Sequence, residues 1–230
     1  MKEYLIIVAG GIGKRFDSKT PKQFLNIAGR PLLMHTILGF YNYSKEIEIF
    51  LVLPQEYFEF WKNLCFEYKF EINHRLVEGG SERFYSVKNA LKFIPDKSFV
   101  AIHDGVRPLV DQTTINKCFS DVKKFGNAIP VSKINDSIRQ ISEDGKSYAI
   151  DRTKFRIIQT PQTFYSGKIK QAYLQEFDES FTDDASVLEK MGEEIHLIEG
   201  NSENIKITKK TDLRFAETLL KIKNNPENQK

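Results

Sequence analysis

Apolar and polar residues follow two alternating patterns along the chain. Residues 4–9 form a continuous apolar run with several β-branched side chains, and similar runs recur downstream. Such runs are typical of strands that are covered on both faces. In the segments between them, apolar residues recur every three or four positions, as on one face of a helix. Strands that alternate with helices of about a dozen residues predict an α/β fold with a doubly wound, mainly parallel sheet. The expected strands are 4–9, 47–53, 72–77, 99–102 and 127–131, and the expected helices are 31–41, 56–68, 81–94 and 113–125.

The alternation of strands and helices breaks after residue 132. Residues 137–141 and 147–150 flank the turn-forming segment 143–146, which predicts an antiparallel hairpin within residues 133–158. A hairpin inserted into an α/β domain usually protrudes, so we expect a β-hairpin arm that mediates dimerisation. We expect residues 1–230 to form a single domain that carries this arm. The last expected elements are helices from 166, over 183–191 and over 211–222, and strands at 195–198 and 205–208.

Composition and charge exclude several classes of function. The 230 residues carry a formal net charge of +3, which is too small to favour nucleic acid or a membrane surface as a partner. The two cysteines, Cys65 and Cys118, lack the spacing of a metal site or a disulfide framework. The N-terminal residues lack the pattern of a signal peptide, and no apolar stretch approaches the roughly 20 residues of a membrane span. These features predict a cytoplasmic protein.

The chemistry of the chain centres on a glycine-rich loop directly after the first strand. Three glycines within residues 10–13 leave the backbone bare, and the cations Lys14 and Arg15 follow them. A third cation, Lys22, stands between proline and glutamine in the segment 21–23. Exposed main-chain N–H groups and nearby cations are suited to hold a polyphosphate. The glycines alone are equally compatible with an ordinary turn, and the cations on both sides favour phosphate binding.

Three phosphate-binding motifs can be compared with this loop. A Walker A loop is excluded, because Arg15 stands where that motif needs serine or threonine and residue 8 is not glycine. A dinucleotide-binding fingerprint matches only in its first half, because Phe16 replaces the third glycine. The third pattern is Gly-x-Gly-x-Arg at 11–15, followed by Pro-Lys-Gln at 21–23. This pattern resembles the loop of nucleotidyltransferases that activate small phosphorylated molecules with a nucleoside triphosphate.

Further motifs along the chain narrow this resemblance to one family. They are Glu78-Gly79-Gly80-Ser81-Glu82-Arg83, Ser86-Val87, His103-Asp104-Gly105-Val106-Arg107-Pro108, Asp151-Arg152, Gln159-Thr160-Pro161-Gln162-Thr163-Phe164, Thr182-Asp183-Asp184-Ala185-Ser186, Glu199-Gly200-Asn201 and Asn204-Ile205-Lys206-Ile207-Thr208. In this order, and over about residues 3–222, the chain resembles the 2-C-methyl-D-erythritol 4-phosphate cytidylyltransferases of the non-mevalonate isoprenoid pathway. The resemblance implies a Rossmann-like sheet of the nucleotide-diphospho-sugar transferase type.

The resemblance also implies a reaction, in which CTP is joined to 2-C-methyl-D-erythritol 4-phosphate and pyrophosphate is released. The attacking phosphate is already an anion at neutral pH, so the enzyme has to overcome repulsion between two anions rather than supply a base. By resemblance, Arg15 and Lys22 stabilise the transition state, and Arg152 and Lys206 orient the methylerythritol phosphate. The implied cofactor is Mg²⁺, bound mainly through the phosphates of CTP.

By the same resemblance, the site residues divide between two ligands. Those implied to bind the nucleotide are Ala9, Gly10, Gly11, Gly13, Gly80, Ser81, Ser86 and Asp104. Those implied to bind the methylerythritol phosphate are Asp104, Arg107, Ser137, Arg152, Thr160, Thr182 and Lys206. Arg107, Ser137 and Arg152 are expected in or near the arm, so the partner subunit of a homodimer would supply them. Ser81 is also expected to be the N-cap of its helix.

Two other functions share part of this pattern. A ribitol-5-phosphate cytidylyltransferase shares the Gly-x-Gly-x-Arg and Pro-Lys-Gln elements, but residues 137–160 and 182–186 look closer to the methylerythritol enzymes. A non-catalytic nucleotide-binding module would be expected to lose its cations, and Arg15, Lys22 and Lys206 are all retained. The four histidines show no paired spacing, so no metal site made by the protein is predicted.

Overall fold

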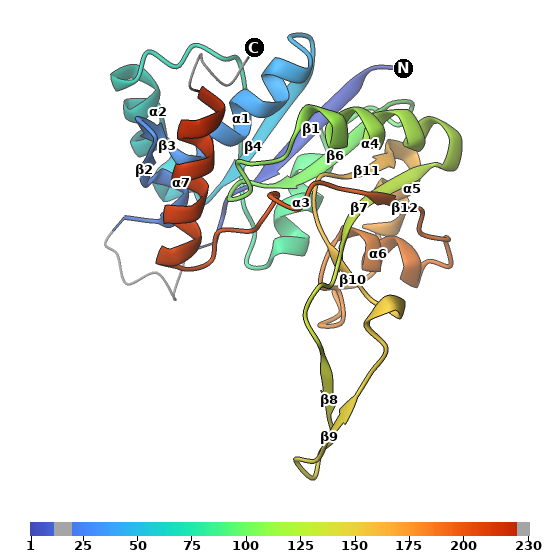
Figure 1. Ribbon diagram of the computed structural model, residues 1–230. Helices are drawn as coiled ribbons and strands as arrows, with labels where there is room; N and C mark the ends of the chain where they lie inside the picture. Colours follow the sequence, from blue (N-terminus) through green and yellow to red (C-terminus); the bar gives the residue numbers. More distant parts are fainter. Residues whose placement is uncertain (12–19, 225–230) are drawn as a thin grey trace.

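The computed structural model describes residues 1–11 and 20–224 of the chain. Within these residues, eight strands form one mixed sheet with helices on both of its faces (Figure 1). The strands β5, β4, β1 and β6 lie side by side in that order and run parallel. The doubly wound, mainly parallel sheet expected from the sequence is therefore confirmed. Their bounds are β1 (Glu3–Val8), β4 (Glu48–Leu53), β5 (Arg75–Glu78) and β6 (Phe99–Asp104).

Beyond β6 the sheet mixes strand directions. Strand β11 (Gln162–Tyr165) lies antiparallel between β6 and β7 (Asn127–Lys133). Strands β10 (Arg156–Ile158) and β12 (Leu197–Glu199) also pair with β7, antiparallel and parallel respectively. The sequence pattern did not predict β11, because its first two side chains are polar although they are fully buried. A buried strand is recognised in a sequence by an unbroken apolar run, and β11 has none.

The parallel strands all end at one edge of the sheet. In chain order their last residues are Val8, Leu53, Glu78 and Asp104. The chain crosses from one side of β1 to the other between β5 and β6, so this edge contains a topological switch point. Ligands of open α/β sheets bind at such a point, outside the carboxyl ends of the strands.

Alternate side chains of β1 face two different helical layers. Leu5 and Ile7 pack in a cluster with α1, α2 and α4, whereas Tyr4 and Ile6 pack with α3, α5 and α6. Within residues 1–11 and 20–224, no helix combines the length and apolar character needed to cross a bilayer. The helices are α1 (Leu32–Tyr43), α2 (Phe58–Glu67), α3 (Arg83–Leu91), α4 (Gln112–Phe125), α5 (Ser166–Ala172) and α6 (Asp184–Lys190).

Local sequence signals set several helix ends, and one of them was predicted wrongly. The carboxylate of Asp111 accepts a hydrogen bond from Thr114 N–H (2.7 Å) and caps α4, which ends at Gly126 with φ +80°. The predicted cap of α3 is wrong, because its N-cap is Glu82 and no side chain caps it. Ser81 lies one residue earlier and faces a cavity described below.

A third apolar cluster joins the C-terminal helix α7 (Lys210–Asn224) to the segment before it. The strand predicted at 205–208 is wrong, because the structure shows no strand in this described segment. The pattern that suggested it has a different cause: Ile205 and Ile207 pack in the α7 cluster, while Lys206 between them faces a cavity. Ile207 N–H donates to the carbonyl of Val106 (3.0 Å), which fixes the segment beside the end of β6.

The hairpin predicted after β7 is present. Strands β8 (Arg139–Ile141) and β9 (Ser147–Ala149) pair antiparallel and project away from the rest of the molecule (Figure 1). All six of their residues are exposed, including the large side chains Ile141 and Tyr148. An exposed hairpin of this kind gains little by packing on its own chain.

Candidate active site

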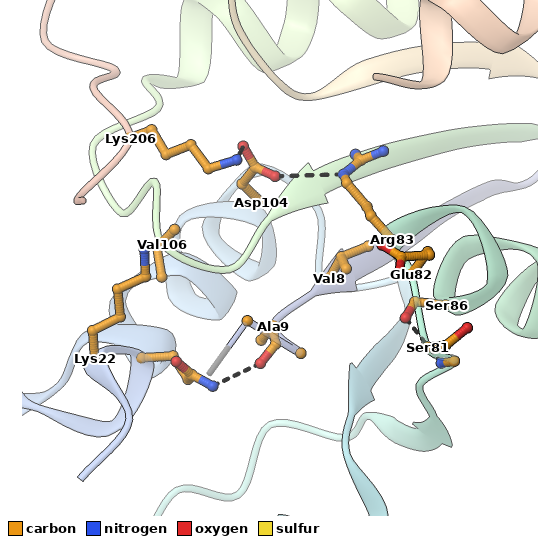
Figure 2. A pocket seen from close by; sticks show the side chains of 14 residues that line it. Val8, Ala9, Lys22, Ser81, Glu82, Arg83, Ser86, Asp104, Val106 and Lys206 are labelled. Carbon is orange, nitrogen blue, oxygen red and sulfur yellow. Dashed lines mark hydrogen bonds and ion pairs between the residues drawn. The ribbon is translucent and has the colours of Figure 1, made fainter. Parts of the chain in front are cut away.

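A cavity of about 330 Å³, the first cavity, opens where β1 and β6 end and where β5 leads into α3 (Figure 2). The predicted transition-state residue Lys22 and the orienting residue Lys206 also line it. Gly13 and Arg15, which were predicted in the same loop, lie outside the described residues. The predicted nucleotide-binding residues that the structure describes all line this cavity: Ala9, Gly10, Gly11, Gly80, Ser81, Ser86 and Asp104.

The glycine loop is anchored at its start by a buried glutamine. The side-chain amide of Gln23 donates a hydrogen bond to the carbonyl of Ala9 (2.7 Å), and Ala9 N–H donates to Val52 in β4 (2.9 Å). Among the residues that the structure describes, a Cβ atom on Gly11 would meet no other atom within 4 Å. None of these described residues therefore fills the space over this glycine.

Gly80 shapes the opposite wall of the first cavity. A Cβ atom on Gly80 would lie 2.3 Å from the Cβ of Tyr85, so no larger residue fits this backbone position. Gly80 N–H donates to the hydroxyl oxygen of Ser86 (3.0 Å), and Ser86 is 4% exposed. No acceptor for the Ser86 hydroxyl is found among the residues described, so its proton is free to meet a ligand.

A second cavity of about 190 Å³ adjoins the first. The two share Arg83, Asp104 and Lys206, which therefore form the junction between them. Of the predicted sugar-phosphate residues, Asp104, Arg107, Thr160, Thr182 and Lys206 line the second cavity. Residues far apart in the sequence thus meet at one edge of the sheet. The described residues expected to bind the nucleotide line the first cavity, and most of those expected to bind the sugar phosphate line the second.

Asp104 is the electrostatic centre of the junction. Its carboxylate lies 3.0 Å from Arg107 Nε, 3.2 Å from Lys206 Nζ and 3.8 Å from Arg83 Nε. Burial alone would raise the pKa of Asp104, but Lys206, Arg83 and Arg107 together hold that pKa well below its usual range. Asp104 is therefore ionised throughout the physiological pH range, and it fixes three cations around one point.

The two lysines of the site are placed by the same extended segment. Lys22 Nζ donates a hydrogen bond to the carbonyl of Ile207 (2.9 Å), while the neighbouring Lys206 reaches Asp104. Figure 2 shows both lysine side chains at the wall of the first cavity, on the side opposite Ser81 and Ser86. The cavity thus has one wall of ammonium groups and one wall of backbone and hydroxyl groups.

The structure corrects the expected location of Arg107. It lies in the body of this chain beside Asp104, is 9% exposed and donates from Nη1 to the carbonyl of Asn204 (2.8 Å). It belongs to the segment that leaves β6, which the resemblance alone had associated with the arm. Ser137 and Arg152 do lie on the arm, both exposed, and neither lines the two cavities. Arg152 instead donates to the carbonyl of Asn135.

A buried histidine holds several of these groups in place. The hydroxyl of Thr160 accepts a hydrogen bond from Asp104 N–H (3.1 Å) and lies 2.9 Å from His103 Nδ1. His103 Nε2 lies 3.0 Å from the carbonyl of Arg107, an acceptor, so Nε2 carries the proton and Nδ1 accepts from Thr160. Burial lowers the pKa of His103 to about 4, so the imidazole is neutral at physiological pH. His103 therefore links Asp104, Arg107 and Thr160 without adding charge.

The sequence reasoning assigned no role to Arg83, although this arginine lines both cavities. It forms a bidentate ion pair with Asp184, with Nη–Oδ distances of 2.7 and 2.6 Å. The signal was present, since both residues stand inside motifs that carried the family resemblance. Their pairing across 101 positions could not be read from the sequence.

Carboxylates at the site bear on how a divalent cation could be held. In residues 1–11 and 20–224, no three His, Cys, Asp or Glu side chains are grouped so that they could hold a metal ion. Asp104 and Glu82 are carboxylates that line the first cavity. A divalent cation would therefore depend on oxygen atoms of a ligand, to which one of these carboxylates could contribute.

This arrangement is suited to bring two anions together. Positive charge lines the two adjoining cavities, supplied by Lys22, Lys206 and Arg107. The ionised Asp104 holds the side chains of Lys206 and Arg107 in place. Preorganised cations of this kind stabilise charge that develops during group transfer. No base is required when the nucleophile is already an anion.

Comparison with known proteins agrees with this chemistry. A family model, described as IspD: 2-C-methyl-D-erythritol 4-phosphate cytidylyltransferase, matches residues 4–222. The chain is 46% identical over 220 residues to the protein of that name from Bacteroides thetaiotaomicron, which covers 96% of this chain and 100% of the relative. It is also 46% identical over 220 residues to the Porphyromonas gingivalis protein of that name, covering 95% and 98% of the two chains.

Solved structures give the same result. The crystal structure of 4-diphosphocytidyl-2C-methyl-D-erythritol synthase from Anaerococcus prevotii superposes with a TM-score of 0.80 at 30% identity, covering 96% of this chain and 98% of that one. The 2-C-methyl-D-erythritol 4-phosphate cytidylyltransferase of Thermus thermophilus gives a TM-score of 0.78 at 27% identity, covering 96% and 100%. Because these matches extend over nearly the whole chain, the chain belongs to the 2-C-methyl-D-erythritol 4-phosphate cytidylyltransferase family.

Proposed function

We propose that this chain transfers the cytidylyl group of CTP to 2-C-methyl-D-erythritol 4-phosphate. The products are 4-diphosphocytidyl-2-C-methyl-D-erythritol, an isoprenoid precursor, and pyrophosphate. Membership of the family makes the chain a nucleotidyltransferase. The observation that carries the assignment is the pair of adjoining cavities that share Asp104, Lys206 and Arg83. Two anionic substrates need two adjacent sites with cations between them, and this junction provides both.

The first cavity is assigned to CTP. The triphosphate would lie beside Gly10 and Gly11, with Lys22 on the facing wall. The base would lie toward Gly80 and Ser86, where backbone groups and a hydroxyl proton can read the edge of a small pyrimidine. Gly80 has no room for a side chain, so its backbone lies close to Tyr85 and Ser86 in this wall.

The second cavity is assigned to the methylerythritol phosphate, held by Arg107, Thr160 and Thr182. Lys206 at the junction would orient its phosphate toward the α-phosphorus of CTP. An oxygen of that phosphate forms the new P–O bond in line, and the bond from the α-phosphorus to the bridging oxygen breaks. The electron pair leaves with pyrophosphate, and no proton is transferred in the step. Lys22, and Arg15 by its place in the sequence, would stabilise the charge that develops.

Magnesium is part of this proposal through the nucleotide. The described residues offer single carboxylates rather than a cage, which fits a cation that arrives with the triphosphate. Asp104 is the carboxylate best placed at the junction, and its low pKa keeps it charged. The cation, when bound, would neutralise phosphate charge and help to orient the leaving pyrophosphate.

The arm is assigned to a homodimer in which each subunit completes the site of the other. Ser137 and Arg152 lie on the arm and away from both cavities of their own chain. Large apolar side chains are exposed on the arm and at its base, among them Tyr148 (55%) and Ile157 (51%). Exposed apolar groups of this kind mark interaction surfaces. A partner subunit would cover them and bring its Arg152 to the methylerythritol phosphate.

The assignment is tested by the release of pyrophosphate. The protein is incubated with Mg²⁺ and CTP, together with either methylerythritol 4-phosphate or ribitol 5-phosphate. We expect rapid release with the first acceptor and slow release with the second. Activity with ribitol phosphate alone would replace the proposed acceptor, and activity with neither would restore the reading of a nucleotide-binding module without catalysis. None of the described residues that line the two cavities specifically favours ribitol phosphate.

A further inference from the structure

We propose that Arg83 is a positioning residue that serves both substrates at once. Held by Asp184 and Tyr173, it fixes the carboxylate of Asp104 at the junction and so sets the affinity of both cavities together. The inference rests on the assignment of the cavities proposed above, but it concerns residues to which that assignment gives no role. Neither Asp184 nor Tyr173 lines either cavity.

The guanidinium of Arg83 is clamped on one side by a buried acid. Nη1 and Nη2 donate to the two carboxylate oxygens of Asp184 at 2.7 and 2.6 Å, and Asp184 is 0% exposed. The hydroxyl of Tyr173, which is 2% exposed, donates to the same carboxylate at 2.6 Å. This fork geometry is specific to arginine, because a lysine ammonium cannot bind both oxygens in one plane. The clamp ties the starts of α3 and α6 to the end of α5.

The other side of the same guanidinium faces the junction. Arg83 Nε lies 3.8 Å from Asp104 Oδ1, whereas Asp104 Oδ2 is held by Arg107 and Lys206. Figure 2 shows Arg83 and Lys206 approaching Asp104 from different directions. The two carboxylate oxygens are thus divided between cations on different elements, which fixes the rotation of the group. Without Arg83, the carboxylate would be held from the side of Arg107 and Lys206 alone.

The charge balance explains why Arg83 positions Asp104 rather than neutralises substrate. Its charge is already matched by Asp184, and both Asp184 and Asp104 raise the pKa of Arg83 even though burial opposes this. Lys22 and Lys206 line the first cavity, where they would meet phosphate groups directly. A displaced Asp104 would move Lys206, which lines both cavities, so both substrates would bind less well. A residue that merely supported the fold would change stability and leave affinity unaltered.

The test compares three variants in the pyrophosphate-release assay, each measured at varied CTP and at varied methylerythritol phosphate. Arg83→Lys keeps the charge but loses the fork, and we expect the KM for each substrate to rise by about five- to tenfold. Tyr173→Phe removes only the remote hydroxyl, and we expect both KM values to rise by about two- to fivefold. The control, Arg214→Lys, alters an exposed arginine on α7 and should leave both values unchanged.

KM values that stay at the wild-type level for both substrates in Arg83→Lys and Tyr173→Phe, whether or not Tm falls, would overturn the inference, as would a change confined to one substrate. If Arg83→Lys does not fold, Tyr173→Phe decides the question by the same criterion. Failure of the proposed function is seen separately, because the unaltered protein would then release no pyrophosphate with this pair of substrates.

Discussion

Removing the ammonium group of Lys206 is the sharpest single perturbation of the junction. Lys206 Nζ lies 3.2 Å from the carboxylate of Asp104, and two unit charges at that distance attract by ~5 kcal/mol at an effective dielectric constant of about 20. The side chain of Lys206 is 45% exposed, so solvent screens the pair, and its net contribution to folding is about 1 kcal/mol or less. The effect on a transition state between two phosphates is larger, because substrates exclude that solvent. Loss of one charge-stabilising donor then costs ~3 kcal/mol, or about 100-fold in rate.

We therefore expect Lys206→Ala to lower kcat about 100-fold while Tm shifts by only a few degrees. The assay is pyrophosphate release at saturating CTP and methylerythritol phosphate, with Tm measured on the same preparation. The matched control is Lys209→Ala, because Lys209 is an exposed lysine of the same segment that lines neither cavity. A folded Lys206→Ala enzyme with kcat within about twofold of the control would refute the role of the junction in catalysis.

Three further predictions concern stability, the first cavity and the arm. Burial lowers the pKa of His103 to about 4 from an ordinary 6.5, so the unfolded chain binds a proton first as pH falls. The free energy of unfolding should therefore decrease by about 3 kcal/mol as the pH falls from the ordinary pKa to the lowered one. Urea unfolding across this pH range measures the decrease, and a flat profile contradicts it. Gly80→Ala should raise the KM for CTP at least about tenfold, because a Cβ atom there would clash with Tyr85. Gly39→Ala should leave that KM unchanged, because a Cβ atom at Gly39 meets no described atom within 4 Å. Equal kinetics in the two variants would exclude the steric argument. Tyr148→Asp should weaken the dimer and make activity fall on dilution; sedimentation that shows the same oligomer in wild type and variant would remove Tyr148 from the interface.

The parallel half of the sheet could be predicted because its strands obey a simple rule. Residues 4–9 and 99–102 are apolar throughout, as strands covered on both faces must be. The same rule did not predict strand β11, because the first side chains of this strand are polar although they are buried. Gln162 makes the position tolerable, since its side-chain oxygen accepts from Ala185 N–H (2.9 Å) and its amide donates to Asp183 (2.8 Å). Such compensation depends on residues about 20 positions away, which local patterns do not contain.

The candidate site was predicted mainly through motifs. The errors in that prediction arise because motifs do not contain contacts between distant segments. Lys206 was correctly predicted as a residue of the site, but the strand predicted to carry it does not form. The alternation of apolar and polar residues over 205–208 reflects packing against α7 instead. Arg107 was associated with the arm although it is buried beside Asp104. Arg83 had no assigned role, because only the fold brings it to Asp184. In each case the missing information was a contact between distant segments.

The central claim is that each cavity holds one of the two substrates, and calorimetric titration of two variants tests it most directly. Ser86→Ala alters a hydroxyl in the first cavity, and Thr182→Val alters one in the second. We predict that Ser86→Ala weakens CTP binding about tenfold and leaves methylerythritol phosphate binding to the enzyme unchanged, and that Thr182→Val does the reverse. Equal weakening of both ligands by either variant, or an exchange of the two effects, would contradict the assignment of the cavities.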